Sequence, residues 1–257
     1  MIAPGRALVT GGAQRLGRAM VEALAADGWQ VAVHYNSSAT DAEALADAVG
    51  GVALGADLLD VKATAGLVDR AAEALGGPLT LLINNASIFE HDDFETATPE
   101  SWERHLGSNL RAPFQLIQAF ARQAPEVGSD TGGEPVARAM VLNMCDMRVR
   151  KLTPQFVTYT LAKSALWTLT QTAAQGLAPK VRVNAIGPGP TMQGVRQSDA
   201  HWQAQRAATI LKRGSDPDEV VAALRFALAM DGFTGQLICL DGGQHLAWRT
   251  PDVLGVE

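Results

Sequence analysis

Residues 10–17 read Thr10-Gly11-Gly12-Ala13-Gln14-Arg15-Leu16-Gly17, between a short apolar run and a helical pattern. A glycine-rich turn from a buried strand into a helix lets backbone N–H groups and the helix N-terminus bind a pyrophosphate. The common G-x-G-x-x-G spacing fails, because Ala13 stands two residues after Gly11. A glycine-rich turn with no ligand is therefore the alternative interpretation of this segment taken alone.

A second segment, Leu81-Leu82-Ile83-Asn84-Asn85-Ala86, ends another apolar run with polar residues. An open parallel sheet binds its ligands at the carboxyl ends of the strands, beside the point where the strand order reverses. We therefore expect both segments to meet at one nucleotide-binding crevice.

Short apolar runs alternate with helical patterns along the chain, which is typical of βαβ units and a parallel sheet. The seven expected strands are Ala7–Thr10, Gln30–Tyr35, Val52–Ala56, Leu79–Asn84, Ala139–Met144, Arg182–Ile186 and Gln236–Leu240. The expected helices are Arg18–Asp27, Asp41–Val49, Val61–Ala74, Pro113–Gln123 and Val157–Leu177, with two more after the caps Thr98 and Asp216. The prediction is an α/β fold, a single Rossmann-like doubly wound domain over residues 1–257 with a seven-stranded parallel sheet.

Two segments, Pro125–Val136 and Gly187–Arg213, are expected to be surface loops. The second is long enough to be a substrate lid.

Composition argues against several kinds of partner and site. The 257 residues include 27 acidic and 21 basic side chains, so no positive field would hold a nucleic acid or an anionic membrane. No apolar run approaches the roughly 18 residues that span a bilayer, and a signal-peptide pattern is missing.

Cys145 and Cys239 are too few for a disulfide framework, so we expect a cytoplasmic protein. His91-Asp92-Asp93 is expected to be a solvated turn and not a metal site.

Several further motifs occur in a characteristic order: Asn84-Asn85-Ala86, Asn109, Tyr159-x-x-x-Lys163 and Pro188-Gly189. With the glycine-rich turn, they make the chain resemble the short-chain dehydrogenase/reductase family over essentially its whole length. The resemblance implies a doubly wound sheet, a nicotinamide cofactor, a homotetramer and a catalytic group that includes Asn109, Tyr159 and Lys163.

Two positions depart from the family pattern. Arg15 stands in the place of a family glycine, and Asp146, 13 residues before Tyr159, stands in the place of the catalytic serine. Both departures resemble the pteridine reductase branch, as do His34-Tyr35, Asn85-Ala86-Ser87-Ile88-Phe89, Gly107-Ser108-Asn109 and Asn143-Met144-Cys145-Asp146. The resemblance implies that Phe89 stacks on a pterin, that Ser87 touches its polar edge, and that Arg15 contacts cofactor phosphate or substrate. An ordinary core role for Phe89 is the alternative.

Three residues are expected to carry the chemistry. Tyr159 and Lys163 are four apart on a predicted helix, so they share a face, and a cation beside a phenol lowers the pKa of that phenol. An ordinary amphipathic helix face is the alternative. Asp146 directly follows a predicted strand, where a carboxylate can relay a proton to a ring nitrogen or hold an amine-bearing heterocycle. An aspartate that only caps a loop is the alternative.

The end of the second predicted strand, His34-Tyr35-Asn36-Ser37-Ser38, has no carboxylate before Asp41. An NAD enzyme would place one there to bind the ribose 2′-hydroxyl, so NADPH is the expected cofactor. Ser37 stands where some pteridine reductases have an arginine, and Asp57 matches an adenine-binding family residue or simply caps a helix. The expected cofactor contacts are Thr10, Gly11, Arg15, Leu16, Gly17, His34, Tyr35, Asn36, Ser37, Ser38, Asp57, Leu58, Asn85, Ala86, Ser87, Lys163, Pro188 and Gly189.

The first hypothesis for function is an NADPH-dependent reductase of dihydropteridines, with Arg15, Ser87, Phe89, Asp146 and Tyr159 at the substrate. The second is a generic carbonyl reductase or alcohol dehydrogenase with an atypical aspartate. The third is a nucleotide-binding sensor that has lost catalysis. Retention of Asn109, Tyr159 and Lys163 argues against the sensor, because a sensor needs only the cofactor pocket.

Overall fold

The computed structural model describes residues 2–194 and 197–249. The strands of its main sheet are β1 (Arg6–Val9), β2 (Gln30–Tyr35), β3 (Val52–Gly55), β4 (Leu81–Asn84), β7 (Ala139–Met144), β8 (Val181–Pro188) and β9 (Leu237–Leu240). They lie in the order β3-β2-β1-β4-β7-β8-β9, and every neighbouring pair is parallel. The order runs outward from β1 and β4, so it reverses between these two strands. The predicted doubly wound, seven-stranded parallel sheet is confirmed.

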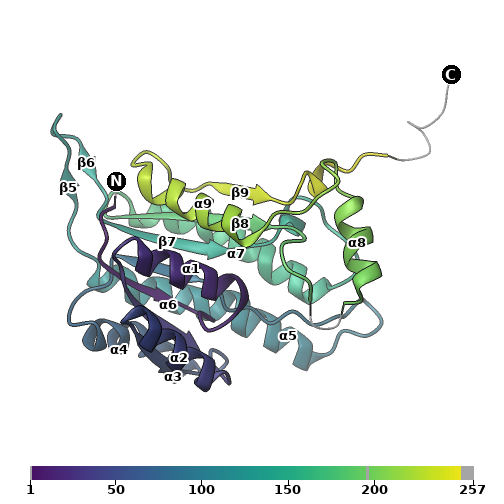
Figure 1. Cartoon of the computed structure of the whole chain (residues 1–257), viewed down its shortest axis with the longest axis horizontal. Helices are drawn as coiled ribbons and strands as arrows, with labels where there is room; N and C mark the ends of the chain where they lie inside the picture. Colours follow the sequence, from purple (N-terminus) through teal and green to yellow (C-terminus); the bar gives the residue numbers. More distant parts are fainter. Residues whose placement is uncertain (1, 195–196, 250–257) are drawn as a thin grey trace.

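Helices cover both faces of this sheet (Figure 1). One face carries α1 (Arg15–Ala26), α2 (Ala39–Val49) and α9 (Pro217–Ala229), and the other carries α4 (Leu67–Ala74), α6 (Ala112–Gln123) and α7 (Val157–Leu177). The shorter helices α3 (Val61–Ala65), α5 (Pro99–Leu106) and α8 (Asp199–Ala207) complete the set. In Figure 1 the strand arrows point toward α8, so α8 lies beyond the carboxyl ends of the sheet.

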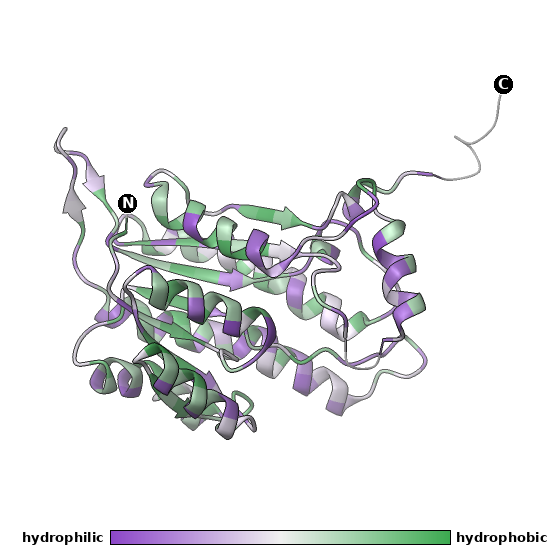
Figure 2. Cartoon of the chain, in the orientation of Figure 1, coloured by the Kyte–Doolittle hydropathy of each residue, from purple (hydrophilic) through white to green (hydrophobic). Residues whose placement is uncertain are grey.

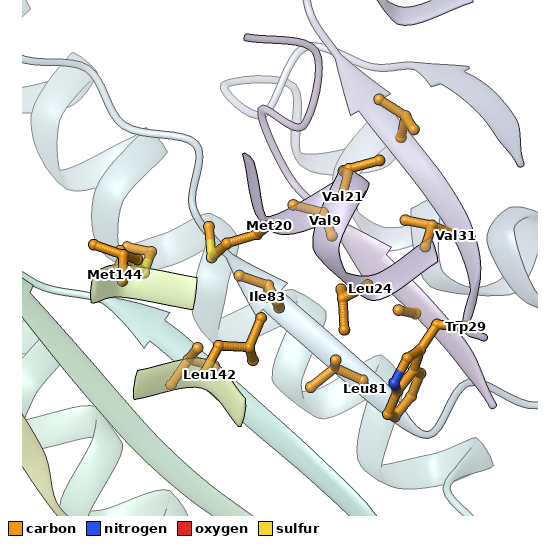
Figure 3. Packing of buried hydrophobic residues seen from close by; sticks show 14 of the residues in the cluster. Val9, Met20, Val21, Leu24, Trp29, Val31, Leu81, Ile83, Leu142 and Met144 are labelled. Atoms are coloured by element: carbon orange, nitrogen blue, oxygen red, sulfur yellow. The ribbon is translucent and has the colours of Figure 1, made fainter. Parts of the chain in front are cut away.

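The core forms two layers, one on each side of the sheet. Leu81 and Ile83 of β4 pack with Met20 and Leu24 of α1, as Figure 3 shows, whereas Leu82 packs into the opposite cluster with α6. Successive side chains of a strand point to opposite faces, so a strand covered on both faces is apolar throughout. Figure 2 shows this pattern as largely green strands between helices that are green on one side and purple on the other.

Both predicted helix starts are confirmed. The Thr98 hydroxyl accepts a hydrogen bond from the Ser101 amide, and the Ser101 hydroxyl accepts one from the Thr98 amide, so α5 begins with reciprocal caps. Asp216 and Glu219 form the same kind of box at the start of α9.

Several boundaries were predicted wrongly. The expected helix Val61–Ala74 is two helices, because Gly66 ends α3 and begins α4, and glycine is a poor helix former. The expected loop Pro125–Val136 contains a short antiparallel pair, β5 (Gly128–Ser129) and β6 (Pro135–Val136). The Asp130 carboxylate closes the turn of that pair by accepting hydrogen bonds from the amides of residues 132 and 134.

The expected lid Gly187–Arg213 is not a loop throughout. Strand β8 continues to Pro188, and α8 follows with the Ser198 hydroxyl accepting a hydrogen bond from the His201 amide at its start. Val195 and Arg196 of this stretch lie outside the described residues. Across the described ranges, no helix is both long enough and apolar enough to cross a membrane.

Candidate active site

The glycine-rich turn is bound to the end of β4. The Thr10 hydroxyl accepts hydrogen bonds from the amides of Asn85 and Ala86 at 2.9 and 3.0 Å. In return, the Asn85 side-chain amide donates to the carbonyls of Thr10 and Gly11. These bonds join the two polar segments at the point where the strand order reverses. The structure therefore brings together the two halves of the predicted crevice.

Two glycines allow the turn to pack closely on α1. Gly11 has a φ of +58°, a region that favours glycine. A Cβ on Gly17 would lie 2.1 Å from the Gly11 carbonyl oxygen, so no larger residue fits there. The residue before α1, Gln14, makes no side-chain cap, which leaves the first N–H groups of the helix without a side-chain acceptor.

Arg15 connects this turn to the segment after β8. Its backbone is left-handed, with a φ of +53°, and its guanidinium donates to the carbonyls of Met192 and Gln193 at 3.1 and 2.9 Å. Pro188 and Gly189, at the end of β8, line the same cavity as Arg15. The departure at position 15 therefore places a cation at the mouth of the site.

His34 supports the turn from inside the protein. Its Nδ1 accepts a hydrogen bond from the Gly11 amide at 3.0 Å, and its Nε2 lies 3.0 Å from the Ala56 carbonyl, to which the neutral ring donates. Burial is the main cause that lowers the pKa of His34 to about 4. Both ring nitrogens are thus used within the protein, so His34 acts on a nucleotide only through Gly11 and not as a direct phosphate ligand.

The other predicted nucleotide contacts lie at the same edge of the sheet. Asn36, Ser37, Asp57 and Ser87 are exposed, whereas Tyr35, Ser38, Asn85 and Ala86 are partly buried and Leu58 is buried in the core. The Asp57 carboxylate accepts a hydrogen bond from the Leu59 amide, so it also stabilises its own turn.

Asp146 lies at the carboxyl end of β7 and contacts Tyr159 of α7. Its Oδ2 accepts a hydrogen bond from the Tyr159 hydroxyl at 2.9 Å and lies 3.2 Å from the Arg148 guanidinium. Its Oδ1 accepts from the Arg148 amide at 2.8 Å. Asp146 therefore caps its loop and also binds the phenol, so it does more than cap a loop.

The expectation of a lowered pKa for Tyr159 is wrong for this arrangement, because the net shift has the opposite direction. Burial, the negative charge of Asp146 and the hydrogen bond to that carboxylate raise the pKa of the phenol well above its usual value. The Lys163 ammonium lies 5.7 Å from the centre of the Tyr159 ring and donates to the Met144 carbonyl at 2.7 Å. Burial also lowers the pKa of Lys163. Tyr159 is therefore protonated and donates its hydroxyl hydrogen to Asp146.

Asn109 lies behind the site and does not line the cavity described next. It is part of a short π-helical segment, Gly107–Arg111, and its side-chain amide bonds both the N–H and the carbonyl of Ile88 at 2.9 and 2.8 Å. Such π-helical turns occur frequently at functional sites. Asn109 thereby fixes the chain between Ser87 and Phe89.

A cavity of about 380 Å³ opens beside these groups. Its lining includes Arg15, Phe89, Asp146, Arg148, Tyr159 and Trp202. The Phe89 side chain is 46% exposed, which contradicts the alternative that it is an ordinary core residue. The Phe89 ring stacks on the Phe156 ring with centroids 4.5 Å apart and an angle of 8° between the planes. The site thus combines a flat aromatic surface, a carboxylate and a phenol.

Sequence reasoning missed Arg148, Phe156 and Trp202. The guanidinium carbon of Arg148 lies 5.4 and 5.1 Å from the ring centres of Phe89 and Phe156, so it covers the aromatic pair. No local pattern marks Phe156 or Trp202, because only the folded chain stacks Phe156 on Phe89 and brings Trp202 of α8 to the cavity.

Three comparisons with known proteins find oxidoreductases similar to this chain. A family model described as "Enoyl-(Acyl carrier protein) reductase" matches residues 11–245. A solved structure of FolM Alternative dihydrofolate reductase 1 from Brucella suis in complex with NADP is 42% identical, with a TM-score of 0.90, covering 98% of this chain and 99% of that chain.

Two curated relatives differ in their substrates. Pteridine reductase 1 of Leishmania tarentolae is 31% identical over 93% of this chain and 96% of its own length. L-2,3-butanediol dehydrogenase of Corynebacterium glutamicum is 32% identical over 92% of this chain and 97% of its own length. Because the family match covers most of the chain, the protein belongs to the short-chain dehydrogenase/reductase family of oxidoreductases.

Proposed function

We propose that the protein is an NADPH-dependent reductase that converts a dihydropteridine to its tetrahydro form. The substrate would be dihydrobiopterin-, dihydromonapterin- or dihydrofolate-like. The observation that carries this proposal is the Asp146 carboxylate, hydrogen-bonded to Tyr159 in a cavity that Phe89 also lines. An ionised carboxylate cannot donate to a ketone oxygen, whereas it accepts hydrogen bonds from the N–H groups of an amino-heterocycle.

The residues present fit a nicotinamide dinucleotide. Gly11 and Gly17 let the turn pack closely against Asn85, Ala86 and α1, and the start of α1 offers N–H groups to a pyrophosphate. Asn36 and Ser37 offer polar groups at the end of β2, and the nearest carboxylate along the chain, Asp41, accepts a hydrogen bond from Gln14. The FolM structure named above was solved with NADP. The cofactor, when bound, supplies a hydride to the substrate.

The protein's own residues would then manage the proton. Tyr159 keeps its proton because its pKa is raised, and Asp146 holds the phenolic oxygen at 2.9 Å. Reduction of a ring C=N bond places the hydride on carbon and a proton on nitrogen. Tyr159 supplies that proton, with the Asp146 carboxylate orienting the ring and relaying the proton between the phenol and the nitrogen. Arg148, 3.2 Å from Asp146, balances the charge of the carboxylate.

A substrate panel with NADPH tests the proposed activity. It contains dihydrobiopterin, dihydromonapterin, dihydrofolate, a vicinal diketone and simple ketones. We expect kcat/KM to be highest for a dihydropteridine. The likeness to L-2,3-butanediol dehydrogenase favours a carbonyl reductase as the second candidate. Clear preference for the ketones would establish that candidate, and tight NADPH binding with no turnover of any compound would indicate a sensor.

NADPH is expected to be used at least about tenfold more efficiently than NADH, since charge-assisted hydrogen bonds to a 2′-phosphate are worth this much. Steady-state kcat/KM for both cofactors measures the preference. The change Ser37→Arg should increase the preference for NADPH, and Ser37→Asp should reduce it because a carboxylate repels the 2′-phosphate. Ser129→Asp on β5 is the charge-matched control and should leave the preference unchanged. Equal use of both cofactors would show that the end of β2 does not recognise a phosphate.

Exposed apolar side chains on both faces of the sheet support the homotetramer that the family resemblance implies. Trp102, Phe114 and Leu161 are 46–48% exposed on α5, α6 and α7, and Phe226 is 46% exposed on α9, on the other face of the sheet. Two separate self-complementary faces are what a dihedral tetramer needs. Light scattering tests the tetramer, and cell fractionation tests the proposed cytoplasmic location.

A further inference from the structure

Asp92 is buried, contrary to the expected solvated turn. Its side chain is 2% exposed, whereas its neighbours His91 and Asp93 are exposed and partly exposed. In the described part of the chain, no group of three or more potential ligands could hold a metal ion. The Asp93 carboxylate bonds only groups of its own loop, the amides of Glu95 and Thr96 and the Thr96 hydroxyl. Asp93 therefore stabilises its own loop, whereas the buried Asp92 has a different role.

Asp92 supplies the cap that α7 lacks. The residue at the start of this helix, Phe156, makes no side-chain cap. Instead, the Asp92 carbonyl accepts hydrogen bonds from the amides of Phe156 and Val157 at 2.6 and 3.4 Å. Its Oδ1 accepts from the Thr158 amide at 3.2 Å, and its Oδ2 accepts from the Thr158 hydroxyl. One residue distant in sequence thus satisfies the first donors of the helix that carries Tyr159.

Two further groups hold Asp92 in place. The Ser101 hydroxyl donates to its Oδ2 at 3.1 Å. His105 is fully buried, and its Nε2 accepts from the Glu90 amide at 3.1 Å, so its Nδ1 carries the proton and donates to the Thr158 oxygen at 2.6 Å. The Thr158 hydroxyl must then donate to Asp92. Burial by itself raises the pKa of Asp92, but the hydrogen bonds from Thr158 and Ser101 outweigh burial and lower it, which keeps the carboxylate charged.

The hydrogen bonds around Asp92 fix two residues at the start of α7 that belong to the site, Phe156 and Tyr159. Phe156 has a φ of +57°, a backbone conformation that is costly for a bulky residue, and its ring stacks on Phe89. Tyr159 directly follows Thr158, and its ring lies 6.0 Å from that of His105 and 4.7 Å from that of Phe89. A residue that fixes the first turn of α7 thereby fixes both the aromatic surface and the phenol.

We propose that Asp92 is a positioning residue for the reaction. It holds the first turn of α7 so that Phe156 stays stacked on Phe89, which lines the cavity, and Tyr159 keeps its hydroxyl on Asp146. This role rests on the proposed function only in that Tyr159 is the proton donor. It does not depend on whether the substrate is a pteridine or a ketone.

Two matched pairs of variants test the role. Asp92→Asn removes the charge and is compared with Asp93→Asn next to it. Thr158→Val removes the hydroxyl at nearly constant shape and is compared with Thr158→Ser, which keeps it. The kcat is measured with the best substrate of the wild type and divided by the concentration of NADPH-binding sites. We expect Asp92→Asn and Thr158→Val to lower this kcat by about 10–100-fold, and the two controls to stay within about twofold.

The Kd for NADPH separates positioning from general damage. We expect it to change by less than about twofold in all four variants, because the dinucleotide turn belongs to β1 and α1. Equal loss of turnover in Asp92→Asn and Asp93→Asn, or a loss of NADPH affinity as large as the loss of kcat, would overturn the proposal. Normal turnover of both Asp92→Asn and Thr158→Val would overturn it as well.

Hydrogen exchange provides a readout that needs no substrate. In the segment 156–162, amide exchange should become at least about tenfold faster in Asp92→Asn and Thr158→Val and stay unchanged in the controls. Unchanged exchange in the first two variants contradicts the role of Asp92 even if the wild type turns over no compound of the panel. If instead the wild type prefers a ketone, the proposed pteridine activity is wrong. The kcat values of the four variants are then compared with that ketone as the substrate.

Discussion

Tyr159→Phe is expected to lower kcat for dihydropteridine reduction by roughly 10²–10⁴-fold, the range for a lost general acid. The change removes only the hydroxyl, which donates to Asp146 at 2.9 Å. The ring keeps its edge-to-face contact with Phe89, whose centroid lies 4.7 Å away, so the cavity keeps its shape. The raised pKa of Tyr159 keeps the phenol protonated. We therefore attribute the lower kcat of Tyr159→Phe to the missing proton donor.

Single-turnover mixing with saturating NADPH measures this effect on the chemical step itself. Fluorescence titration of NADPH serves as the control, and its Kd should match that of the wild type. Near-normal turnover of Tyr159→Phe would exclude the phenol as the acid and leave Asp146 or water in that role.

Lys163→Met is expected to lower kcat/KM by roughly 10²–10³-fold, through both the chemical step and cofactor binding. The ammonium is 2% exposed and donates to the Met144 carbonyl, and it lies 5.7 Å from the Tyr159 ring. A positive charge at this distance stabilises the phenolate that remains after Tyr159 gives up its proton. The family resemblance also implies a contact from Lys163 to the cofactor.

Steady-state kinetics with varied NADPH, together with thermal unfolding, measure the effect of this change. Met fills the space of the Lys stem, so we expect a folded protein with a lower kcat and a higher KM for NADPH. An unchanged kcat would show that Lys163 only anchors Met144.

The sheet was predictable because its signals are local. Every main-sheet strand is a short apolar run, and the polar residues that follow β1 and β4 mark the carboxyl edge. Thr10 and Asn85 meet there because parallel strands align their ends, so two segments far apart in sequence identified one crevice. Asp146 was located for the same reason, since it comes two residues after the end of β7.

Other features depend on contacts that no local pattern reveals. Asp92 caps a helix 66 positions away, so its own loop, rich in polar residues, predicted exposure. The pKa of Tyr159 was expected to fall because the helical spacing puts Lys163 on its face, but the spacing says nothing about Asp146, whose carboxylate accepts a hydrogen bond from the phenol. Burial and the carboxylate then determine the direction of the shift.

We infer that the Asp146 carboxylate adapts the family's catalytic group to a pteridine ring. Asp146→Ser restores the residue type that the family has at this position. If the carboxylate serves ring nitrogens, this variant should lose dihydropteridine reduction. A ketone should be reduced equally well or better, because a serine hydroxyl can donate to the carbonyl oxygen.

The most direct test is therefore the ratio of dihydropteridine to ketone turnover, measured at saturating NADPH for the wild type and for Asp146→Ser. Saturation removes cofactor affinity from the comparison. Our account predicts that the ratio falls by at least about tenfold in the variant, as loss of a charged hydrogen bond would cause. An unchanged ratio, or a wild type that reduces ketones far better than any pteridine, would contradict it.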